Sequence, residues 1–93
     1  KEVCIKKSTL HGKGVFAQRN IETGETIGMV RIDNKRTPIG RYLNHSVTPN
    51  AQFRPIDQDI YLAALTEINK DTEITVDYRH ALETNKSLMR ITV

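Results

Sequence analysis

The sequence predicts a compact, mostly β fold of short antiparallel strands. Short apolar runs recur along the chain, and glycine, proline, asparagine and aspartate residues that favour turns separate them. No amphipathic helix alternates with these runs, which argues against βαβ units and a dinucleotide-binding fold. A chain of 93 residues provides one small core, so we expect a single domain over residues 1–93.

The first elements are a strand pair and a longer strand. Val3 and Ile5 alternate with polar residues, and an apolar run over 14–17 follows a glycine-rich turn, which predicts a hairpin or strand corner. A strand over 26–32 comes next, and Gly28 within it indicates a bulge or a close approach of another segment. Residues 33–40 are polar and end in turn formers, so we expect them to connect elements without forming one.

Three further strands are expected over 51–54, 60–65 and 74–78, and only 80–89 has helical composition. The segment 68–74 weakly repeats 21–27, with Asp71 where the first copy has Gly24. Aspartate tolerates a left-handed backbone better than most residues, so both positions fit a turn. An internal duplication and two similar β-turns explain this repeat equally well.

Composition excludes some classes of function. The uncharged stretch over 60–66 is far shorter than the roughly 20 apolar residues that span a bilayer, and no signal-peptide pattern opens the chain, so we expect an intracellular protein. The single cysteine, Cys4, forms no internal disulfide or zinc cage and is expected to be a small buried residue, so no metal site is predicted. Residues 1–54 carry a net charge of +6 and residues 55–93 carry −3, but the basic residues are scattered, which argues against nucleic-acid binding.

Three separated segments together resemble the motifs of the SET domain family, in the family's order. They are Gly-Lys-Gly-Val-Phe-Ala over 12–17 with Ile-x-x-Gly-Glu-x-Ile over 21–27, Arg-Tyr-Leu-Asn-His-Ser-Val-Thr-Pro-Asn-Ala over 41–51, and Ala-Leu-Thr-Glu-Ile over 64–68 with Glu-Ile-Thr-Val-Asp-Tyr over 73–78. The resemblance covers residues 3–78. It implies a SET-type (β-clip) fold in which the segment after Tyr78 passes near Asn44 as a threaded, knot-like C-terminal segment. It also implies methyl transfer from S-adenosylmethionine to a protein lysine.

The resemblance assigns the cofactor to residues in the first two segments. Glycines let a backbone approach closely and aim amides at a carboxylate, and an asparagine side chain suits an ammonium. Without the resemblance, the glycines would shape a hairpin, and the asparagine and histidine would form an ordinary turn. The implied cofactor residues are Gly12, Lys13, Gly14, Val15, Arg41, Asn44 and His45.

Tyr78 falls where the family has its catalytic tyrosine. A free lysine has a pKa near 10.4, and a narrow apolar channel beside a sulfonium lowers that pKa toward the neutral, reactive amine. The Tyr78 hydroxyl would then orient the amine and the methyl group. The alternative is a packing tyrosine at a strand end, as Tyr42 and Tyr61 appear in this sequence.

The sequence departs from the family between the strand at 26–32 and Arg41, where typical members carry a longer insert with aromatic residues. Two functions from different classes therefore stand side by side: a lysine methyltransferase, and a noncatalytic SET-like interaction module that has lost its substrate groove. If the chain is an enzyme, a partner must complete the substrate channel. A second copy is the economical candidate, which predicts a homodimer.

Overall fold

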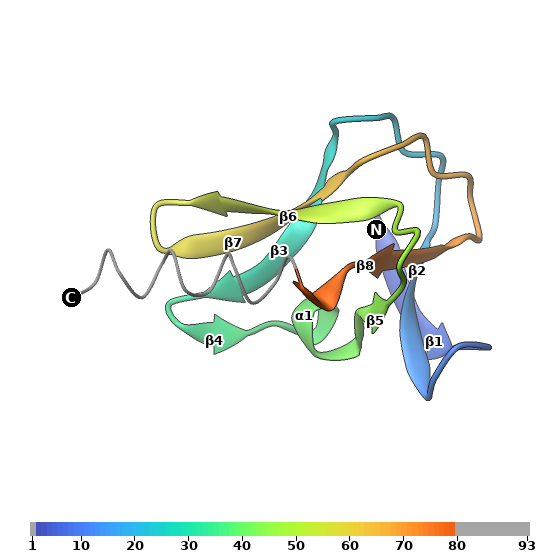
Figure 1. Cartoon of the computed structure of the whole chain (residues 1–93), viewed down its shortest axis with the longest axis horizontal. Helices are drawn as coiled ribbons and strands as arrows, with labels where there is room; N and C mark the ends of the chain where they lie inside the picture. Colours follow the sequence, from blue (N-terminus) through green and yellow to red (C-terminus); the bar gives the residue numbers. More distant parts are fainter. Residues whose placement is uncertain (1, 80–93) are drawn as a thin grey trace.

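The computed structural model describes residues 2–79, and these form two four-stranded sheets with one short helix (Figure 1). The strand order is β1-β2-β8-β5 in one sheet and β4-β3-β7-β6 in the other. The elements are β1 (Val3–Lys7), β2 (Lys13–Ala17), β3 (Thr26–Ile32), β4 (Lys35–Arg36), α1 (Pro38–Tyr42), β5 (Asn44–His45), β6 (Ala51–Ile56), β7 (Asp59–Ala64) and β8 (Glu73–Val76). The expected mostly β architecture of short, chiefly antiparallel strands is confirmed.

The second sheet consists of two hairpins, β3–β4 and β6–β7, which join where β3 lies beside β7. β3 pairs with β7 and β7 pairs with β6, all antiparallel. The register between β3 and β7 shifts next to Gly28, so the expected bulge is present. A Cβ at Gly28 would stand 2.7 Å from Ile39 Cδ1, so the close approach expected there is made by the helix.

The expectation for residues 33–40 is wrong, because this segment forms regular structure. Asp33 and Asn34 both adopt positive φ, at 49° and 67°, and turn the chain from β3 into β4. The Thr37 hydroxyl then accepts a hydrogen bond from Gly40 N at 3.2 Å, and Pro38 occupies the first turn, so α1 begins with a side-chain cap and a favourable proline. Two short elements therefore stand where the composition indicated only a connection.

The weak repeat in the sequence corresponds to a local two-fold arrangement. Ile21 and Ile68 exchange backbone hydrogen bonds at 2.8 and 2.9 Å. The bond from Ala17 N to Thr72 O has its counterpart in the bond from Ala64 N to Glu25 O, in which the donor lies 47 positions later and the acceptor 47 positions earlier. The turn positions also match, since φ is 84° at Gly24 and 71° at Asp71. The two turn units are therefore bonded to each other, and this pairing links the two sheets.

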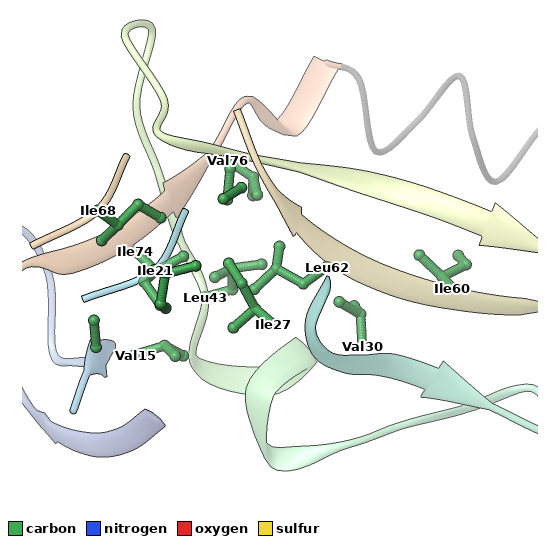
Figure 2. Close-up of a cluster of buried hydrophobic side chains, with 13 residues drawn as sticks. Val15, Ile21, Ile27, Val30, Leu43, Ile60, Leu62, Ile68, Ile74 and Val76 are labelled. Atoms are coloured by element: carbon green, nitrogen blue, oxygen red, sulfur yellow. The ribbon is translucent and has the colours of Figure 1, made fainter. Parts of the chain in front are cut away.

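The core lies where the two sheets meet. Figure 2 shows side chains of β2, β3, β7 and β8 converging with Leu43 from the segment after α1. The largest fully buried side chains are Ile21, Leu62, Ile68, Ile74, Val15 and Val76. Cys4 is only half-buried, because β1 lies at the edge of its sheet. The expectation that it is a buried residue is therefore wrong.

Two expectations for the last part of the chain, the helical composition of 80–89 and the threaded segment after Tyr78, lie outside the described residues. Within residues 2–79, no helix is long and apolar enough to cross a membrane. No three histidine, cysteine or acidic side chains of the same range gather as a metal site.

Candidate functional site

The site begins with the one parallel strand pair among the described residues. β5 runs beside β8, with Asn44 opposite Thr75 and His45 opposite Val76. Both strands are short and follow turns, so the residues just beyond them are brought together. The backbone N–H of Tyr78 donates to His45 Nδ1 at 2.9 Å, and the two rings lie 5.0 Å apart between centroids. The second and third sequence motifs therefore meet at this point.

The Tyr78 hydroxyl is held in a defined direction. It donates to the backbone carbonyl of Leu43 at 2.7 Å, while the side chain as a whole is half-exposed. A phenol has one proton and two acceptor lone pairs. Because the proton is engaged by Leu43, the lone pairs remain available to accept from a neighbouring N–H or polarised C–H group.

Asn44 is buried and is oriented by three acceptors. Its Nδ2 lies 3.1 Å from His11 O, 3.1 Å from Lys13 O and 2.8 Å from Glu73 Oε2. All three neighbours can only accept, so the amide nitrogen must face them and Oδ1 must face the opposite way. Within residues 2–79, Oδ1 accepts no hydrogen bond, which leaves it as an oriented acceptor.

Glu73 connects this asparagine to the glycine-rich segment. Its Oε1 accepts from Ser8 Oγ at 2.7 Å, and its Oε2 accepts from Asn44. A Cβ at Gly14 would lie only 2.2 Å from that same Oε2. Glycine at position 14 is therefore required because the Glu73 carboxylate occupies the space beside its Cα.

The other residues of the first motif contribute in different ways. Gly12 adopts φ of 47° in an exposed turn, where a side chain would be strained but not obstructed. Lys13 is exposed, and its ammonium lies 5.8 Å from the centroid of the Tyr42 ring. Val15 is 0% exposed and packs into the core between β1 and β8, where it holds the preceding glycine-rich backbone in place.

A cavity of about 340 Å³ opens beside Tyr78. Its apolar wall consists of Val30, Leu43, Phe53, Ile60 and Val76, and three arginines, Arg31, Arg36 and Arg41, complete the lining with Gly40 and Tyr78. Arg41, at the end of α1, thus shares this cavity with Tyr78 and Leu43. The structure does not place it with the hydrogen bonds around Asn44 and Gly14.

The segment that carries Tyr78 is fixed by its neighbours. Asp77 pairs with the Arg79 guanidinium at 2.6 Å and accepts from the Arg79 backbone at 2.9 Å. The side-chain hydrogen bond from Arg79 is the main reason that the pKa of Asp77 falls from 3.8 to about 2. Asp77 is therefore ionised throughout the physiological range.

Sequence reasoning missed three polar residues of this site. Ser8 and Glu73 orient Asn44, while Asn50 donates to Glu73 O at 2.9 Å and accepts from Thr75 N at 2.9 Å. Glu73 and Asn50 both stood inside the recognised motifs, but a motif gives no contact between positions 23 residues apart. Only the strand register brings the two together.

Comparison with known proteins identifies the family. The family model described as SET domain matches residues 28–79, which is more than half of the chain. A histone-lysine N-methyltransferase specific for H3 lysine 4 from Emericella nidulans is 29% identical over 122 residues, covering 89% of this chain and 10% of that protein. Human histone-lysine N-methyltransferase 2B is 26% identical and covers 87% of this chain and 4% of its own length. The chain thus spans about a tenth or less of these relatives.

Solved structures give the same answer for the fold. A candidate histone methyltransferase of Plasmodium falciparum superposes with a TM-score of 0.65 at 28% identity, covering 84% of this chain and 97% of that one. The Chaetomium thermophilum Polycomb Repressive Complex 2 bound to S-adenosylmethionine contains a chain that superposes with a TM-score of 0.71 at 19% identity, covering 92% of this chain and 17% of that one. Family match and fold agree: this chain belongs to the SET domain family.

Proposed function

We propose that this chain binds S-adenosylmethionine and transfers its methyl group to the side-chain amine of a protein lysine, with Tyr78 as the catalytic residue. The SET family and its histone-lysine methyltransferase relatives support protein lysine methylation in general. The observation that carries the proposal for this chain is the Tyr78 hydroxyl, which is hydrogen-bonded to Leu43 O beside the apolar wall of the cavity.

The residues around Asn44 fit the cofactor. An ammonium needs acceptors, and Asn44 Oδ1 is an oriented acceptor on a buried residue, which solvent reaches and no described residue uses. We assign the backbone of the Gly12, Lys13, Gly14 and Val15 segment to the carboxylate at the same end of the cofactor and the backbone of His45 to its adenine, and we assign Arg41 to the cofactor from the side of the cavity. The cofactor supplies an electrophilic methyl group on a positively charged sulfur.

Tyr78 and the cavity would act on the incoming lysine. The apolar wall disfavours a charged ammonium and so lowers the pKa of the amine. With its proton on Leu43 O, the Tyr78 oxygen accepts from a neutral amine N–H and fixes the direction of the nitrogen lone pair. The wall also excludes water from the amine, which protects the neutral form.

The cavity needs a further wall. Only β4 and the start of α1 occupy the position where typical members carry a longer insert, and Tyr78 is 49% exposed. We propose that a second copy of the chain supplies this wall, as expected from the sequence. We also retain the proposal of an intracellular protein without nucleic-acid binding.

Thermal unfolding with and without cofactor tests the proposal. A ligand that binds only the native state stabilises the protein by about 2.7 kcal/mol at 100 times its dissociation constant, so S-adenosylmethionine should raise Tm. The reaction product, S-adenosylhomocysteine, is the matched ligand and should also raise Tm. No shift with either compound at millimolar concentration would contradict the proposal and favour the noncatalytic interaction module.

A further inference from the structure

The cavity beside Tyr78 has an unusual charge. Among the residues 2–79 that line it, three of ten are arginines and none is acidic. Arg36 on β4 and Arg41 on α1 are exposed, and neither forms a hydrogen bond or ion pair with another side chain in residues 2–79. Acidic side chains do occur elsewhere among the described residues, and the half-buried Asp77, next to Tyr78 in the sequence, pairs with Arg79 and not with these two arginines.

This charge creates a problem for a lysine substrate. A lysine approaches as a cation, and like charges across an interface oppose binding. A peptide rich in lysine and arginine would bring several such charges against Arg31, Arg36 and Arg41. The same field would favour loss of the proton once the amine is inside, because nearby positive charge lowers its pKa.

An acidic residue next to the lysine resolves the conflict. Guanidinium groups pair with carboxylates in a planar, two-bond geometry. A glutamate or aspartate a few residues from the target lysine would offset the repulsion at the mouth and leave the apolar wall for the lysine stem. Arg41 is proposed above to serve the cofactor, so Arg36 is the group left for the substrate.

We infer that the substrate of this chain is a protein segment in which acidic residues flank the methylated lysine. This inference rests on the proposed lysine methylation and adds the chemical class of the substrate. The occupant of the cavity mouth is thus an acidic peptide. A basic peptide would bind less well, because its flanking positive charges would add to those of the arginines in the cavity.

Three peptides test the inference. They share one central lysine and differ only in the flanking positions, which are glutamate, glutamine or lysine. Binding to the full chain is measured by fluorescence anisotropy at about 0.1 M and 1 M salt, where the screening length is roughly 10 and 3 Å. We expect the glutamate peptide to bind about five- to twentyfold more tightly than the glutamine peptide at low salt, with the difference largely lost at high salt.

Two charge-reversal variants test whether the peptide binds at Arg36. Arg36→Glu should reverse the order of the glutamate and lysine peptides, whereas Lys70→Glu, the same charge change at an exposed position outside the cavity, should preserve it. Melting curves show whether each variant is folded. Calorimetry with S-adenosylmethionine should give the same affinity for Arg36→Glu as for the unmodified chain.

The outcomes separate the inference from the proposed function. The inference is overturned if the unmodified chain binds the lysine peptide as tightly as the glutamate peptide, or more tightly. It is also overturned if Arg36→Glu weakens cofactor binding, because the Arg36 guanidinium would then serve the cofactor. The inference is supported if the glutamate peptide binds more tightly at low salt and if Arg36→Glu reverses the order of the glutamate and lysine peptides. If the glutamate peptide binds in this way but no peptide is methylated, the acidic-partner surface stands and the methyltransferase function fails.

Discussion

Replacing Gly14 by alanine should destabilise the protein through the Glu73 carboxylate. The new Cβ would lie 2.2 Å from Glu73 Oε2 and 3.2 Å from Asn44 Nδ2. Glu73 is a flexible side chain and would move away, which breaks its hydrogen bonds to Ser8 and Asn44. Each bond to a charged group contributes about 1.5–3 kcal/mol when buried, and these are half-buried, so we expect a loss of about 2–4 kcal/mol.

A double-mutant cycle measured by urea unfolding isolates this cause. In the Glu73→Ala background only Asn44 Nδ2, at 3.2 Å, remains close to the new Cβ, so Gly14→Ala should cost less than about 1 kcal/mol there. Gly12→Ala is the matched control. Nothing lies within 4 Å of a Cβ at Gly12, and its φ of 47° alone should cost about 1–2 kcal/mol in either background.

The thermal scale provides a second measure. For a domain of this size, each kcal/mol lowers Tm by about 4–8 °C, so Gly14→Ala should lower it by roughly 10–30 °C. The reasoning is refuted if Gly14→Ala costs the same with and without Glu73. That result would mean that the backbone at Gly14, and not the carboxylate beside it, requires glycine.

Three other predictions concern the cofactor, the segment of Tyr78 and the missing wall. Asn44→Ala should weaken S-adenosylmethionine binding by about 1–3 kcal/mol, because a cofactor ammonium would lose its oriented acceptor. Unchanged affinity by calorimetry in a folded variant would remove Asn44 from the cofactor site. The Asp77 carboxyl should titrate near pH 2 by NMR and move back toward 3.8 in Arg79→Ala. Because the pKa of Asp77 is depressed in the folded state, its contribution to stability is complete above the pKa of the unfolded chain and is lost as pH falls through about 2. A titration midpoint of Asp77 near 3.8 in the unmodified chain would contradict the ion pair with Arg79. Specific methyltransferase activity should fall on dilution as a dimer dissociates, and a monomer with undiminished activity at nanomolar concentration would exclude a second copy as the wall.

Local pattern predicted the three longer strands of the second sheet well. β3 was expected with its observed bounds, and β6 and β7 to within two residues at each end, because their apolar runs are bounded by clear turn residues. The bulge at Gly28 and the left-handed turn at Asp71 also followed from residue type. These features depend on neighbouring residues, which the sequence displays directly.

Features set by distant contacts were missed. β4 and α1 were read as a connection, because two-residue strands and five-residue helices lack a periodic pattern and depend on caps such as Thr37. The family resemblance identified Asn44, His45 and Tyr78 as candidate site residues. The hydrogen bonds that Glu73 accepts from Ser8 and Asn44 form only because β8 lies between β2 and β5. Strand order is a property of the whole chain, which local residue patterns do not specify.

The central claim is that Tyr78 orients an amine for methyl transfer, and Tyr78→Phe tests it most directly. The variant removes only the hydroxyl that donates to Leu43 O. We expect kcat for methylation of a lysine peptide to fall by at least about tenfold, with the affinity for S-adenosylmethionine nearly unchanged. Equal turnover by Tyr78→Phe and the unmodified chain would contradict the account.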